Sequence, residues 1–164
     1  METSDQDEIL IVVDAQDNVV DYLPRARVHE KKLLHRTISI VTFNSEGKIV
    51  LQRRSKNKDT YPGMLGNAVG GHVTKEESYL DAAKNEALEE LNIDIEPEFL
   101  GKAIINDPLH RTMTSIFKIT HDGPYDFNKE EIDEIIILSL EEIKEQFEKL
   151  SESTKIVFKE LGIV

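Results

Sequence analysis

The chain has 164 residues, 39% of them apolar, and its 32 acidic and 20 basic residues give a net charge of -12. This length and apolar content predict a single globular domain over residues 1–164 with a hydrophobic core. The absence of cysteine excludes disulfides, thiolate metal sites and cysteine nucleophiles, and no apolar run approaches the roughly 20 residues that a membrane span needs.

Strands and helices are expected throughout the chain. Residues 1–8 are acidic and polar, unlike a signal peptide, so we expect a cytoplasmic protein with a disordered N-terminus. Apolar runs between turn residues predict strands over residues 9–14, 19–23, 37–43, 48–52, 64–69, 95–105, 112–120 and 132–138. Helices are expected over residues 74–91, 140–150 and 153–161, with at most two helical turns within 24–34. Mixed strands with helices on either side indicate an α/β sandwich.

The helix that ends before Asn92 has clear local signals. Thr74 and Glu77 have the spacing of a capping box, which predicts that the helix begins there. Asn92 can adopt the left-handed conformation that ends a helix. Apolar residues at helical spacing predict a buried stripe formed by Leu80, Ala83, Ala87 and Leu91.

Three carboxylates lie on one flank of this helix, at Glu86, Glu89 and Glu90. Like charges at this spacing repel each other unless they share a cation. Mg²⁺ binds through one or two carboxylates and keeps positions for water and phosphate oxygens. The cluster therefore predicts a magnesium site, although such a run can also be a solvated helix face.

The stretch from Arg25 to Lys58 is strongly basic, with ten basic and two acidic residues. Arginine and lysine bind phosphate oxygens, and we expect Arg53, Arg54 and Lys56 to supply such contacts. Strand alternation should turn only one of the two arginines toward a cleft. The acidic net charge and the lack of aromatic residues among the basic ones argue against nucleic-acid binding.

The histidines give a weaker signal. His72 follows a Gly-Gly pair and is a candidate for contact with a substrate, as are the pairs His35-Arg36 and His110-Arg111. No two histidines have the sequence spacing of metal ligands, so the sequence supports no zinc site.

The segment from Gly71 to Ile93 resembles the Nudix box, G-x5-E-x7-R-E-U-x-E-E-x-G-U, where U is apolar. The matching residues are Gly71, Glu77, Glu86, Ala87, Glu89, Glu90 and Ile93. Two residues differ from the box: Asn85 replaces the arginine that usually pairs with a box glutamate, and Asn92 replaces the glycine. The first change implies weaker metal binding or slower turnover.

The Nudix resemblance implies an α/β/α sandwich with a mixed β-sheet and a hydrolase that cleaves a small-molecule diphosphate compound with Mg²⁺ or Mn²⁺. Glu86, Glu89 and Glu90 would hold one to three ions, with the Gly70 carbonyl as a further ligand. Gly71 and Glu77 would be structural. The general base remains open among four carboxylates: Glu86, Glu89, Glu131 and Glu134.

Most of the chain, from about Ile9 to the last strand, also resembles Nudix-type isopentenyl diphosphate isomerases. Their catalytic cysteine is replaced here by Gly70, and the segment HRTMTSIF (residues 110–117) lacks their catalytic glutamate. Without these proton-transfer groups we do not expect isomerase activity. A different alternative is a non-catalytic module that binds a nucleotide or diphosphate, which Asn85 favours. The N-terminal strands could support a homodimer.

Overall fold

The computed structural model describes residues 7–58 and 61–164, and the fold is stated for these residues. The strands are β1 (Ile9–Val13), β2 (Val19–Pro24), β3 (His35–Phe43), β4 (Ile49–Arg54), β5 (Leu65–Asn67), β6 (Val69–His72), β7 (Glu98–Asn106), β8 (Arg111–Thr120) and β9 (Ile132–Leu138). The helices are α1 (Arg25–Glu30), α2 (Tyr79–Leu91), α3 (Leu140–Glu145) and α4 (Glu152–Glu160), with a 3-10 turn, η2, at Phe147–Lys149.

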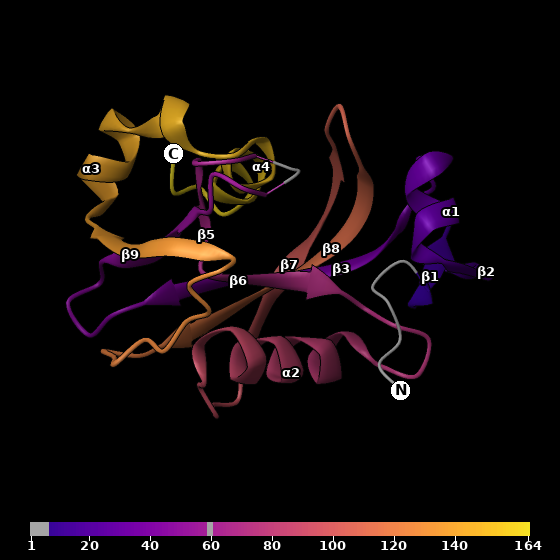
Figure 1. Ribbon diagram of the computed structural model, residues 1–164, viewed down its shortest axis with the longest axis horizontal. Coiled ribbons are helices and arrows are strands. Elements are labelled where there is room, and N and C mark those ends of the chain that lie inside the picture. Colours follow the sequence, from indigo (N-terminus) through magenta and orange to yellow (C-terminus); the bar gives the residue numbers. More distant parts are fainter. Residues whose placement is uncertain (1–6, 59–60) are drawn as a thin grey trace.

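Strand β3 is the centre of the sheet (Figure 1). Along one edge it pairs in parallel with β8 over its whole length, and β8 pairs antiparallel with β7. Along the other edge it pairs antiparallel with three strands in turn: β1 at His35, β6 from Thr37 to Ile40, and β4 at Thr42 and Phe43. The sheet is therefore mixed, as expected from the sequence.

Strand β4 carries the second part of the sheet. It pairs with β9 along the whole of one edge, whereas along the other edge it pairs first with β3 and then, after the two strands diverge, with β5. This divergence curls the sheet into a half-barrel, and β5 and β6 separate where β3 and β4 part. The predicted hairpin between β3 and β4 is present, but only its end next to the turn is paired.

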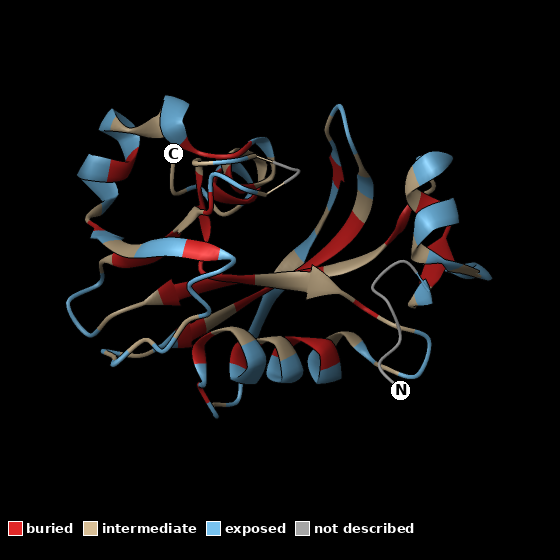
Figure 2. Ribbon diagram, in the orientation of Figure 1, coloured by how far each residue is buried: buried red, intermediate tan, exposed pale blue. Residues whose placement is uncertain are grey.

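Helices cover both faces of the sheet, so the expected α/β layering is observed (Figure 1). Neighbouring residues of β3 point to opposite faces: Ile40 packs against the buried alanines of α2, whereas Val41 belongs to the core formed with α3 and α4. A smaller cluster packs Val28 of α1 against Leu10 and Val12 of β1. The buried segments of the strands lie between these helices (Figure 2).

The site helix, α2, begins later than the sequence suggested. Its N-cap is Ser78, whose side chain accepts a hydrogen bond from the backbone N–H of Asp81 in a reciprocal capping box. Thr74 contacts Glu77 as expected, but within the turn before the helix. Leu80 was expected in the buried stripe and is 38% exposed, since the later start makes it only the second helical residue.

Other local expectations are confirmed. Ala83, Ala87 and Leu91 are buried, and Asn92 ends α2 in the left-handed conformation with φ 53°. The expectation of disorder over residues 1–8 is not tested, because residues 1–6 lie outside the described residues. Among the described residues no helix is long and apolar enough to span a membrane.

Candidate active site

The carboxylates of α2 face the Gly-Gly segment of β6. The backbone N–H of Gly70 donates to Glu90 Oε2 at 3.2 Å. A Cβ atom on Gly71 would lie 2.5 Å from Cδ of Glu86, so any larger residue would displace that side chain. The glycine pair therefore lets the helix approach the strand closely enough to bring the carboxylates against the backbone.

These carboxylates line a cavity of about 800 Å³. Glu86, Glu89 and Glu90 all contribute to its wall, together with the backbone of Gly70 and Gly71. Its other polar walls come from the end of β4, the loop before β9, the start of α1 and the start of β8. The cavity is thus built where β3, β4 and β6 separate, and α1, α2 and α4 all contribute to its wall.

The carboxylates lie in an environment that opposes their negative charge. Burial, followed by repulsion from Glu89 and Glu77, raises the pKa of Glu86 to about 8. Burial and the nearby Glu86 raise the pKa of Glu90 well above its ordinary value, against the opposing effect of the Gly70 N–H and Arg54. A bound cation would relieve this repulsion, so the donor set suits a hard divalent ion.

The two adjacent arginines of β4 have different surroundings. Arg54 lines the cavity near Glu90, and burial lowers the pKa of its guanidinium while Glu90 and Glu131 oppose that shift. Arg53 donates from Nε to Glu134 Oε1 at 2.8 Å and from Nη1 to the Gly63 carbonyl at 3.2 Å. Strand alternation thus selects Arg54 for the cavity, as expected for one of the pair.

The two candidate bases near β9 also have different surroundings. Glu131 lines the cavity, and its carboxylate lies 4.0 Å from Lys58 Nζ. Glu134 and Lys56, like Arg53, are not among the described residues that form the cavity wall. Lys58 takes the place expected for Lys56; it belongs to the same basic stretch, but nothing in the sequence singled it out.

Asn85 retains part of the role of the missing arginine. Its Nδ2 donates to Glu77 Oε2 at 2.8 Å, and Glu77 Oε1 accepts from the N–H and the hydroxyl of Thr74. Glu77 therefore ties the turn before α2 to the middle of the helix. The link is a hydrogen bond to a neutral amide, so it adds no positive charge beside the carboxylates.

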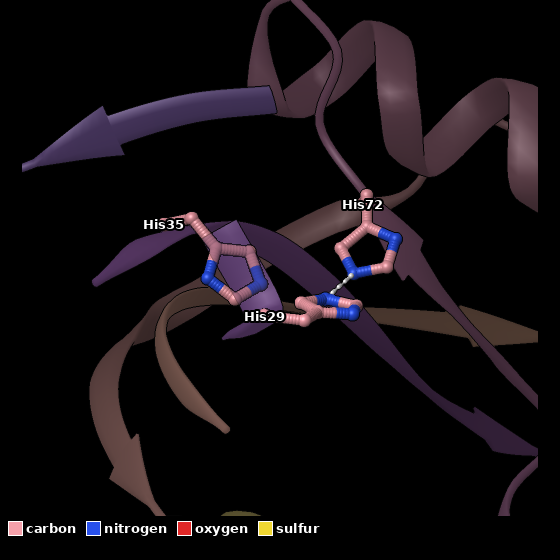
Figure 3. A group of neighbouring side chains, drawn as sticks. All are labelled: His29, His35 and His72. Carbon is pink, nitrogen blue, oxygen red and sulfur yellow. Dashed lines mark hydrogen bonds between the residues drawn. The ribbon is translucent and has the colours of Figure 1, made fainter. Parts of the chain in front are cut away.

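Histidines gather at another part of the cavity wall. His29, His35 and His72 offer nitrogen atoms that all lie within 4.8 Å of one another, and the ring of His110 contacts that of His29 (Figure 3). Burial is the main cause that lowers their pKa values, to about 4 for His29 and well below the ordinary value for His72. The sequence supported no zinc site because no two histidines have the spacing of metal ligands along the chain; the structure brings three of them together from separate elements.

Comparison with protein families decides the classification. A model of the NUDIX domain matches residues 33–161, which is most of the chain. The chain belongs to the NUDIX family. It is 37% identical over 133 residues to an uncharacterised Nudix hydrolase of Yersinia pestis, covering 80% of this chain and 73% of that protein. It is 34% identical over 133 residues to the uncharacterised Nudix hydrolase YfcD of Escherichia coli, covering 80% and 74%.

Solved structures agree with the NUDIX fold. The crystal structure of DR0079 from Deinococcus radiodurans superposes with a TM-score of 0.78 at 23% identity, covering 93% of this chain and 98% of that one. The NUDIX domain of NrtR from Shewanella oneidensis, solved with ADP ribose, gives a TM-score of 0.62 at 16% identity, covering 84% and 96%. At these identities the structures support the fold alone.

The likeness to isomerases covers less of the chain than expected. The isopentenyl-diphosphate Delta-isomerase of Serratia proteamaculans is 41% identical over 90 residues, which is 55% of this chain and 50% of that protein.

Strand β8 lines the cavity with the hydroxyl-bearing residues Thr112 and Thr114. The Thr114 hydroxyl is hydrogen-bonded to those of Thr112 and Thr37, and a threonine hydroxyl is a poor proton carrier at neutral pH.

Proposed function

We propose that this NUDIX protein hydrolyses a diphosphate bond in a nucleoside diphosphate derivative or a similar small molecule, with Mg²⁺ or Mn²⁺ as cofactor. The observation that carries the proposal is the convergence of Glu86, Glu89 and Glu90 on the Gly70–Gly71 backbone at a cavity wall. Burial, followed by repulsion between the carboxylates, raises the pKa values of Glu86 and Glu90, so the arrangement favours a divalent cation as its partner.

The three glutamates would hold the metal, with the Gly70 carbonyl as a backbone candidate. When bound, the cation would neutralise phosphate charge and lower the pKa of a coordinated water. Arg54 and Lys58 also line the cavity, where they would bind the phosphate that leaves. Arg54 is one of the two arginines expected from the sequence and Lys58 takes the place expected for Lys56, while His72 lies at the histidine end of the same cavity.

The candidates for the general base are the carboxylates at the cavity wall, where a bound water would be within reach. Glu86, Glu89 and Glu131 all line the cavity, whereas Glu134 is engaged by Arg53. Glu131 lies on the cavity wall, 4.0 Å from Lys58 Nζ. We favour Glu131 as the base, because it stays available when the three α2 carboxylates are used as metal ligands.

The direct test is hydrolysis of a panel of nucleoside diphosphates, triphosphates, nucleotide sugars and ADP-ribose, in Mg²⁺, in Mn²⁺ and in EDTA. ADP-ribose belongs in the panel because a structural neighbour was solved with it. Metal-dependent release of phosphate or monophosphate is expected. No turnover of any compound in either metal would overturn the proposal.

Glu90→Gln is expected to abolish metal-dependent turnover, because it removes one charge from the carboxylate set and alters the contact with the Gly70 N–H. Glu134→Gln is the matched control: it makes the same chemical change on a carboxylate that pairs with Arg53 outside the cavity wall. Turnover by Glu90→Gln at the wild-type rate would contradict the assigned site. The Mg²⁺ affinity of the Glu90→Gln variant can be measured by calorimetry.

A second candidate function is a binding module with little turnover. Asn85 favours it, because the hydrogen bond to Glu77 brings no charge to orient the metal-binding carboxylates. Asn85→Arg discriminates between the two functions. A sharp rise in hydrolysis from near zero would identify the natural chain as a binding module, whereas efficient turnover by the unmodified chain would establish the hydrolase.

A further inference from the structure

Tyr61 differs from the other aromatic residues in its position and its contacts. Among the described residues that line the cavity, it is the only tyrosine or phenylalanine. The ring of Tyr79, by comparison, is covered by the cationic groups of Arg36 and Lys102. Within the described part of the chain, neither an aromatic ring nor a lysine or arginine group packs on the ring of Tyr61. A flat ligand could therefore use this ring as a stacking surface.

Tyr61 is held in place at both its backbone and its side chain. Its φ is 50°, a left-handed conformation that is unfavourable for a bulky residue. Its carbonyl accepts from the N–H of Met64 at 3.2 Å, and its hydroxyl donates to Asp107 Oδ2 at 2.6 Å. Backbone strain of this kind persists only where the surroundings enforce it, and it is common at ligand sites.

Asp107 is itself a fixed anchor for the ring. Its Oδ1 accepts from the N–H groups of Leu109 and His110 in the turn between β7 and β8. Burial, followed by the hydrogen bond to Asp107, raises the pKa of the Tyr61 hydroxyl, so it stays protonated and continues to donate. The side chain thus links the loop after β4 to the β7–β8 turn at the cavity wall.

The ring also lies close in the fold to the residues proposed to bind phosphate. The turn that begins at Tyr61 pairs with Arg54: the Arg54 N–H donates to the Met64 carbonyl at 2.9 Å, and its carbonyl accepts from Gly63 at 3.0 Å. Arg54 and Lys58 line the same cavity as Tyr61. A molecule whose phosphates contact these two cations would extend its remaining part along the wall that contains Tyr61.

Asn67 adds a hydrogen-bond acceptor to the cavity wall. It is only 8% exposed, and its Nδ2 donates to Ser39 Oγ at 2.9 Å. Its Oδ1 is buried and has no hydrogen-bond partner among the described residues. A buried acceptor without a partner costs free energy, which an N–H group of a ligand would recover. A nucleobase combines such an N–H with a flat π-face, whereas a sugar offers only hydroxyl donors.

We propose that the cavity binds a nucleobase, with its face on Tyr61 and an N–H directed to Asn67 Oδ1. The substrates would then be nucleoside diphosphate derivatives rather than diphosphates of sugars or of apolar alcohols. The inference rests on the proposed function for the position of the phosphates. It concerns binding, so it can be measured without turnover.

The test is calorimetry in Mg²⁺ with the α,β-methylene analogues of ADP, CDP, GDP and UDP, whose bridging carbon resists hydrolysis. Methylenediphosphonate serves as the probe without a nucleoside. Wild-type protein is expected to bind at least one nucleotide analogue more tightly than methylenediphosphonate. Tyr61→Leu should weaken that binding by about 10-fold or more, the order of loss from removing one base–aromatic stack, and leave methylenediphosphonate unaffected.

Three further variants separate stacking from general damage. Tyr61→Phe should keep most of the affinity, because it keeps the ring. Asn67→Leu should weaken the nucleotide analogue several-fold and leave methylenediphosphonate unaffected, because it removes the acceptor. Tyr22→Leu is the matched control: it makes the same change as Tyr61→Leu at an exposed tyrosine outside the cavity wall, and should change neither affinity.

NMR of the bound analogue identifies the group that contacts the ring. Its base protons should shift upfield through the ring current of wild-type protein, and this shift should disappear in Tyr61→Leu. Shifts confined to the ribose protons, equal affinity of wild type for methylenediphosphonate and all four nucleotide analogues, or a loss in Tyr61→Phe as large as in Tyr61→Leu would overturn the proposal. Binding that depends on Tyr61 without hydrolysis of any compound would support the base site and refute the hydrolase.

Discussion

At the scale of single residues, close contact between Gly71 and Glu86 shapes the site. The glycine faces the carboxyl group of Glu86 so closely that a methyl group in its place would lie 2.7 Å from Oε1. Because Glu86 is a long side chain, it can move away from such a methyl group without unfolding the helix. The position is therefore expected to control the placement of the carboxylate more than the stability of the fold.

Gly71→Ala should leave the protein folded and reduce metal-dependent turnover by about 100-fold, the order of loss that a displacement of about 1 Å can cause. Gly101→Ala is the matched control, because a Cβ there meets nothing within 4 Å. Turnover and Mg²⁺ affinity are measured for both variants beside their circular dichroism. Equal activity of the two variants would show that Glu86 does not need its present position.

At the scale of elements, the start of α2 depends on which of two similar sequences forms the cap. Thr74 with Glu77 and Ser78 with Asp81 both place an acid three residues after a hydroxyl. The structure uses the second pair as the capping box, while the first pair closes the preceding turn. Both pairs have the same spacing in the sequence, so the spacing could not distinguish them. The path of the chain between β6 and α2 determined which pair caps the helix.

Ser78→Ala should lower the free energy of unfolding by about 1 kcal/mol, since it removes the acceptor for the Asp81 N–H at the helix start. Ser78→Asn should be close to neutral, because asparagine caps about as well as serine. Chemical denaturation of the two variants and the wild type measures the difference. A loss in Ser78→Asn as large as in Ser78→Ala would contradict the capping role.

At the scale of the whole molecule, the divergence of β3 and β4 creates the cavity and buries carboxylates in its wall. Glu86 has a folded-state pKa of about 8 against an ordinary value of 4.5. The folded protein therefore binds more protons than the unfolded chain between these pH values. The stabilisation that comes from protonated Glu86 is complete below pH 4.5 and is lost as the pH rises through about 8.

Without metal, the free energy of unfolding of the wild type should therefore fall relative to that of Glu86→Gln as the pH rises from 4.5 to 8. Denaturation of both proteins in EDTA across this range gives the difference in free energy of unfolding directly. Both proteins contain the same histidines, so the comparison isolates the effect of Glu86. Adding Mg²⁺ should stabilise the wild type more at the upper end of the range, where the carboxylate is ionised. A difference that stays constant with pH would contradict the buried position of Glu86.

The sequence by itself determined what depends on neighbours along the chain. Periodicity identified α2 and its carboxylate flank, and the box motif predicted the family and the mixed α/β fold. Turn residues delimited most of the strands, but residues 64–69, expected as one strand, are divided between β5 and β6. Strand alternation also required that Arg53 and Arg54 point to opposite sides. These features follow from the fixed geometry of helices and strands, so a single sequence contains them.

Only the tertiary structure decided which groups meet. It places Arg54 rather than Arg53, Glu131 rather than Glu134 and Lys58 rather than Lys56 at the cavity wall. Their positions depend on how β4 and β9 pair and on where the cavity opens. It also brought together histidines that share no regular spacing, through the register of β6 on β3 and the packing of α1. Contacts between distant segments depend on register and packing, which no local pattern encodes.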